Sequence, residues 1–178
     1  LPIYLAGYTV PTDTVTLTTP DLAMTKTVTA TDIAATAGTD VVVGETVTYQ
    51  LVVTLPQGSG ELLLTDALTD GLAALTATVV ALGDGTNVTS ANIAQGDTDA
   101  SAAIAIGPGG DSVSFDFGLV TVLGEDDAAA TDTTIVIEVT AAVADVAAVA
   151  DGAALTNTAT LAVADPDDGA PLQPDPGS

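Results

Sequence analysis

The chain has 178 residues, a length that supports one domain with its own hydrophobic core. It carries 24 Asp and Glu against a single Lys, a net charge of −23 that makes nucleic acid and anionic membranes poor partners. It has no cysteine and no histidine, which excludes disulfides, thiolate metal sites and histidine-based catalysis and favours a structural or binding protein over an enzyme.

The first 20 residues differ from the rest and predict an extended arm. Pro2, Pro11 and Pro20 divide this stretch and prevent a continuous helix. No apolar run in the chain is long enough for a transmembrane helix, so we expect a secreted protein whose signal peptide has been removed. The residues expected to act in assembly through this arm are Leu1, Ile3, Leu5, Tyr8, Val10, Val15 and Leu17.

From residue 21 onward, apolar residues alternate with threonine, a pattern typical of β-strands. Residues 143–154 are rich in alanine and predict one or two helical turns, whereas residues 166–178 have the Pro/Asp-rich composition of a linker. Seven or more short strands between turns indicate an all-β fold, an antiparallel β-sandwich over residues 21–165. The strands are predicted at 21–31, 44–56, 61–72, 75–82, 112–122, 133–143 and 154–164, with a further short one within 100–107.

The only cation of the chain, Lys26, lies where a lysine is not expected. In a strand it shares a face with Met24 and Val28, so it is predicted to point into the core. A buried ammonium without a partner costs several kcal/mol. A group that neutralises or consumes Lys26 is therefore expected nearby.

Strand alternation predicts which polar groups share the core with Lys26. Asp66 lies on the apolar face of its strand, and Asn157 lies on the apolar face of the last strand. Glu45 is a second candidate for the acid, at the entrance of its strand. Glu138 has the opposite parity from its apolar neighbours and is predicted to face solvent.

Five segments, in order, resemble one known kind of surface module: DLAMTKTV, VGETVTYQLVVTLP, LLLTDALTDGL, FDFGLVTV and LTNTATLAVADPDD. This is the immunoglobulin-like repeat domain of bacterial and archaeal adhesins and fimbrial shaft proteins, which includes isopeptide-forming fimbrial domains. The resemblance covers residues 21–168 and implies an immunoglobulin-like β-sandwich in an extracellular scaffold. In its isopeptide-forming members a lysine of the first strand joins an asparagine of the last, assisted by an acid. These positions correspond to Lys26, Asn157 and Asp66.

Burial favours the neutral forms of a lysine and a carboxylic acid, the forms that amide formation requires. The alternative is a buried ion pair between Lys26 and Asp66, with Asn157 hydrogen-bonded to the backbone or to water. Both alternatives place the three groups together in the core.

Acidic loops suggest a possible calcium site, because carboxylates supply the oxygen ligands that Ca²⁺ requires. No EF-hand pattern is present, and solvated surface charge explains the same residues. The candidate ligands are Asp84, Asp97, Asp99, Glu125, Asp126, Asp127, Asp165, Asp167 and Asp168.

These observations predict a structural subunit of an extracellular, pilus-like filament that polymerises with copies of itself. Residues 1–17, or part of them, are expected to donate a strand to the next subunit and so form a head-to-tail contact. The alternative is a single module of a large surface adhesin or stalk, with calcium as its possible ligand. The scarcity of aromatic residues argues against a sugar-binding module.

Overall fold

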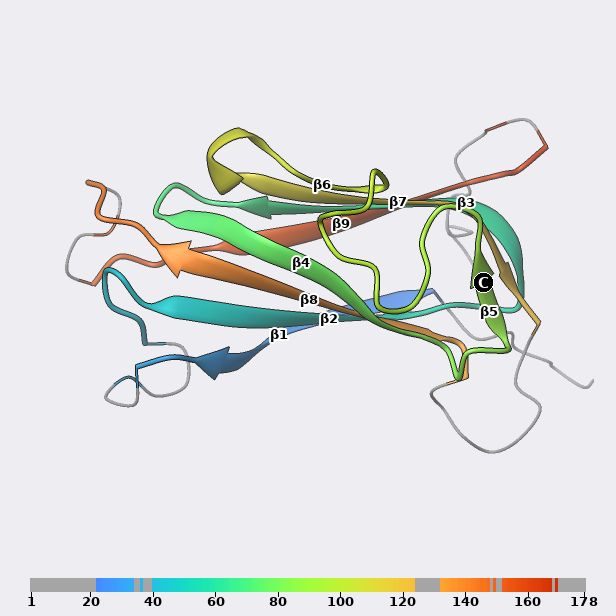
Figure 1. Ribbon diagram of the computed structural model, residues 1–178, viewed down its shortest axis with the longest axis horizontal. Helices are drawn as coiled ribbons and strands as arrows, with labels where there is room; N and C mark the ends of the chain where they lie inside the picture. The colour runs from blue at the N-terminus through green and yellow to red at the C-terminus, as the bar shows by residue number, and fades with distance from the viewer. Residues whose placement is uncertain are drawn as a thin grey trace, which may run out of the picture.

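The computed structural model describes residues 22–33, 36, 40–123, 132–147, 149, 152–167 and 169, which form two antiparallel sheets packed face to face (Figure 1). The first sheet has the order β1-β2-β8-β4, with β1 Ala23–Thr31, β2 Thr46–Thr54, β8 Thr134–Val143 and β4 Leu72–Leu82. The second has the order β5-β7-β3-β9, with β5 Val88–Ser90, β7 Ser112–Val122, β3 Gly58–Leu68 and β9 Asn157–Ala164. The short strand β6 (Ile104–Ile106) also pairs with β7, and a single 3₁₀ turn (η1) covers Pro108–Gly110. The predicted all-β antiparallel sandwich is confirmed.

Alternation along the strands builds the core between the sheets. Leu51 of β2, Leu64 of β3 and Ile137 of β8 are fully buried, and Phe115 stacks on Phe117 at 6.4 Å between ring centroids. Each fully buried side chain of this size contributes about 1.5–3 kcal/mol through the hydrophobic effect. The outer faces carry the alternate threonines, which explains the Thr-rich composition.

The structure differs from the predicted elements in three places, the first of which is β5, for which no strand was predicted. The predicted strands 61–72 and 75–82 are separated by a tight turn at 69–71, and β4 already begins at Leu72. Gly71 has a φ of +101° in this turn, which the strand pattern does not reveal. The helical turns expected in 143–154 are wrong for the described residues, which form bends and turns. The amide of Ala144 hydrogen-bonds to Gly71 O instead of continuing a helix.

The described chain enters and leaves the sandwich at the same end. Ala23 pairs with Thr54, and Ala164 pairs with Glu61 near the start of β3. We call this the entry end, which lies on the right in Figure 1, and the opposite end, where Leu68 pairs with Asn157, the far end. Among the described strands, β1 pairs only with β2 and β9 only with β3, so both are edge strands. The described residues contain no helix with the length and apolar character needed to cross a membrane.

Candidate functional site

A lysine from one sheet meets an aspartate from the other in the interior of the sandwich. Lys26 of β1 donates a hydrogen bond from Nζ to Asp66 Oδ1 of β3. The Asp66 side chain is 0% exposed and the Lys26 side chain 15% exposed, so this is a buried ion pair between the sheets. The predicted inward direction of both residues is confirmed.

The third member of the predicted cluster is bound to the same carboxylate. Asn157 is the first residue of β9 and lies opposite Leu68, two positions beyond Asp66 along β3. Asn157 Nδ2 donates to Asp66 Oδ2 at 3.3 Å. Asn157 Oδ1 is buried and has no hydrogen-bond partner among the residues that the structure describes. The carboxylate of Asp66 thus bridges the first and last strands, and the Asn157 carbonyl oxygen is unsatisfied.

The surroundings of Lys26 favour its neutral form more than water does. Burial lowers the pKa of Lys26, although the hydrogen bond and negative charge of Asp66 oppose this change. The Tyr49 ring on the neighbouring strand lies beneath the amine, with 5.1 Å from Nζ to the ring centroid. Burial, and then the charge of Asp66, raise the pKa of Tyr49. Contact between Tyr49 and Lys26 was not predicted from the sequence. The alternation of β2 places Tyr49 on the apolar face of its strand, and this pattern could have indicated it.

Glu45, the second candidate for the acid, is fully buried but serves a different purpose. It accepts hydrogen bonds from the Thr36 hydroxyl and from the amide of Val42 at 2.9 Å. These bonds, led by that of Thr36, lower the pKa of Glu45 against the opposing effect of desolvation. Glu45 therefore stabilises the loop that connects β1 to β2 through these hydrogen bonds. Asp66 is the acid beside Lys26.

Glu138 lies on the outer face of the first sheet, as predicted. Its Oε1 accepts a hydrogen bond from Gln50 Nε2 at 3.4 Å across the β2–β8 pair. It takes no part in the buried cluster.

Within the described part of the chain, no three acidic side chains gather into a group able to hold a metal ion. Asp84 accepts from the Thr86 hydroxyl, Asp97 from the amide of Ala94 at 2.8 Å, and Asp165 from the amide of Asp167 at 2.8 Å. These carboxylates stabilise their own turns, and Asp99 Oδ1 accepts weakly from the amide of Ala77 at 3.3 Å. Glu125, Asp126, Asp127 and Asp168 lie outside the described residues, so calcium binding stays a prediction. The same holds for the assembly residues Leu1, Ile3, Leu5, Tyr8, Val10, Val15 and Leu17.

No protein-family model and no curated protein sequence matches the chain. Among solved structures, it is similar to the pilus backbone RrgB from Streptococcus pneumoniae, with 19% identity and a TM-score of 0.43 over 85% of this chain and 34% of that one. The full-length RrgB pilus protein matches with 17% identity and a TM-score of 0.41, over 81% of this chain and 22% of that one.

The chain thus spans about a third or less of the pilus proteins that it matches.

Proposed function

We propose that the chain is a structural domain of an extracellular filament, strengthened by an isopeptide bond between Lys26 and Asn157. One observation carries the chemical part of this proposal. A single buried carboxylate contacts both the amine of the first strand and the carboxamide of the last strand. Fixed proximity of this kind replaces much of the entropy cost of a reaction between two side chains.

The reaction proceeds within the cluster without any outside reactant. The Lys26 ammonium passes a proton to Asp66 along their hydrogen bond, a step that removes both charges from a site with little access to water. Rotation of the Asn157 carboxamide turns Oδ1, which has no partner among the described groups, toward the protonated carboxyl. The neutral Nζ then attacks Asn157 Cγ while Asp66 hydrogen-bonds to the oxygen on which negative charge develops.

Collapse of the tetrahedral intermediate completes the exchange of one amide for another. The new Nζ–Cγ bond remains and the Cγ–Nδ2 bond breaks. The two protons that Nζ gives up, one of them by way of Asp66, leave with Nδ2 as an ammonium ion, which is ammonia plus one proton. No oxidation or reduction takes place, and Asp66 ends as it began. The event happens once in each molecule, so it is self-modification and not enzymatic turnover.

The consequence is mechanical. The bond joins β1, an edge strand of one sheet, to β9, an edge strand of the other, so pulling on the first and last strands cannot separate the two sheets there. In a protein without cysteine it takes the place that disulfides have in other extracellular domains.

The intact mass of the purified chain tests this bond. A mass lower than that of the unmodified sequence by one ammonia is expected, and Asn157→Ala should restore the unmodified mass expected for its sequence. A wild-type chain at its full calculated mass would exclude the bond and leave the buried ion pair.

For assembly, we propose that residues 1–17 donate a strand to the next subunit, so that the chain polymerises head to tail. The alternation of apolar residues in this segment supports the proposal. The second candidate function is a module of a large surface adhesin, supported by the linker-like composition of residues 166–178. Electron microscopy of the purified chain distinguishes them, since a subunit forms long filaments whereas an adhesin module remains a monomer.

A further inference from the structure

The arm carries little charge for so acidic a chain. Residues 1–20 contain one carboxylate, Asp13, out of 24 in the whole sequence. A mostly apolar strand with one carboxylate can approach the acidic body of a second copy with much less repulsion than two bodies meet. The arm of one copy is therefore a suitable ligand for the body of another, provided that the body has a site to receive it.

The far end of the sandwich contains such a place. A cleft of about 580 Å³ opens between the β1–β2 hairpin and the segment that leads into β9. Its apolar lining includes Val28, Val47 and Tyr49 of β1 and β2, Leu72 at the start of β4, and Leu155 before β9. Asp40 adds one carboxylate. This volume lies in the range of about 300–1,000 Å³ that is usual for binding pockets.

The position of this cleft relative to the arm decides what an exchange would build. The arm joins the body at Leu22, at the entry end, whereas the cleft lies at the far end. A contact between opposite ends of two copies leaves one arm and one cleft free, so it repeats and gives an open chain. We propose that the far-end cleft is the acceptor for residues 1–17 of a second copy. This rests on the filament function proposed above.

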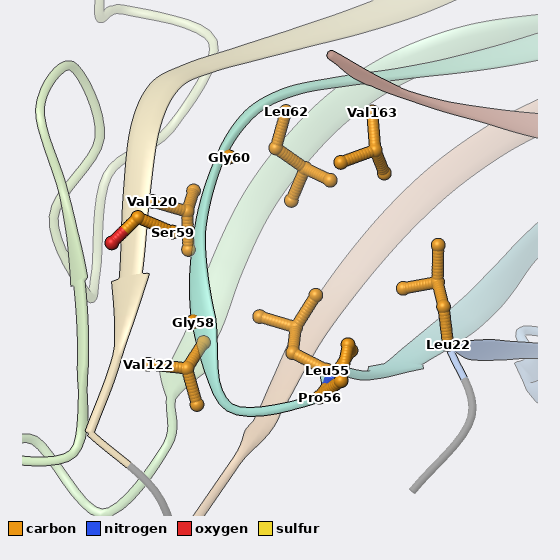
Figure 2. A pocket seen from close by; sticks show the side chains of 10 residues that line it. All are labelled: Leu22, Leu55, Pro56, Gly58, Ser59, Gly60, Leu62, Val120, Val122 and Val163. Carbon is orange, nitrogen blue, oxygen red and sulfur yellow. The ribbon is translucent and has the colours of Figure 1, made fainter. Parts of the chain in front are cut away.

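A second cavity, at the entry end, is smaller and almost wholly apolar. Its volume is about 100 Å³, and its walls include Leu55, Val120, Val122 and Val163 (Figure 2). This is the share of about three water molecules in the liquid, too little for several side chains of a strand. Leu22 itself lines this cavity, so an arm bound there on another copy would lead to reciprocal exchange and a closed dimer.

Cysteine cross-linking distinguishes these arrangements, because the natural chain has no cysteine. Single cysteines are placed at arm positions 3, 5, 8 and 15, and each variant is mixed with Ala153→Cys in the cleft under mild oxidation. Ser59→Cys, at the entry-end cavity, is the matched control. A disulfide needs Cβ atoms about 3.8 Å apart, so only residues that lie together react.

We expect at least one arm position to cross-link to Ala153→Cys about tenfold more than to Ser59→Cys, because docking raises the effective concentration. A chain with both the arm cysteine and Ala153→Cys should form a ladder of multimers. Cross-linking to Ser59→Cys alone, ring closure within one chain, or no product above the control would overturn the proposal.

Failure of the proposed function gives different results from failure of the acceptor site. Long filaments without cross-links to Ala153→Cys would refute only the cleft. A chain that never forms filaments under the microscope would refute the filament function itself. Intact mass reports the isopeptide bond separately in every variant.

Discussion

Asn157→Ala offers the sharpest test of the bond, because it removes the reacting carboxamide and leaves the Lys26–Asp66 ion pair intact. A bond between residues 26 and 157 closes a loop of about 130 residues in the unfolded chain. The chain-entropy relation for cross-links then gives a stabilisation of about 5 kcal/mol. Without the bond, the variant loses only one long hydrogen bond from Asn157 to Asp66, which contributes about 1 kcal/mol.

Urea unfolding of the wild type and of Asn157→Ala measures this difference. Thr158→Ala, an exposed neighbour on the same strand, is the matched control and should change stability little. In a domain of this size, a loss of about 5 kcal/mol lowers the melting temperature by about 10–20 °C. A loss of only about 1 kcal/mol, with equal electrophoretic mobility of the two denatured chains, would refute the covalent bond.

Three further predictions concern the surroundings of the cluster and one turn. In the Asn157→Ala background, Lys26→Met should lower the free energy of unfolding by a further amount of about 3–5 kcal/mol, because Asp66 is left buried without its partner. Adding Asp66→Leu to this variant should recover most of that loss, as measured by urea unfolding. Gly71→Ala should destabilise the fold and slow the loss of ammonia measured by mass, because φ is +101° at this position and the new Cβ would lie 2.5 Å from Val149. If the variant loses ammonia at the wild-type rate, this turn has no role in placing β9. The Thr86 hydroxyl, followed by backbone amides, lowers the pKa of Asp84 below its ordinary 3.8, so this carboxylate stabilises the fold above pH 3.8 and the benefit disappears as the pH falls through the folded-state pKa. Asp84→Asn should therefore be less stable than wild type at neutral pH, with a gap that narrows in acid; a gap independent of pH would contradict this.

The sequence by itself determined the fold class and the direction of the three key side chains. Strand alternation has a period of two, so the apolar neighbours of Lys26, Asp66 and Asn157 already indicate that all three point inward. The same reasoning placed Glu138 on the outer face. These are local properties of single strands, and a single sequence contains them in full.

Only the tertiary structure decided which groups meet. Parity allowed both Asp66 and Glu45 as the acid, and the distinction depends on which strands face one another across the sandwich. Sheet pairing brings Asp66 to Lys26 and Asn157, whereas Glu45 is used by the Thr36 hydroxyl and the Val42 amide in its own loop. Strand pairing likewise decides that Leu22, to which the arm is joined, and the far-end cleft lie at opposite ends of the sandwich. The contacts of Asp66 join residues 40 and 91 positions apart, and no local pattern of residues encodes such a pairing.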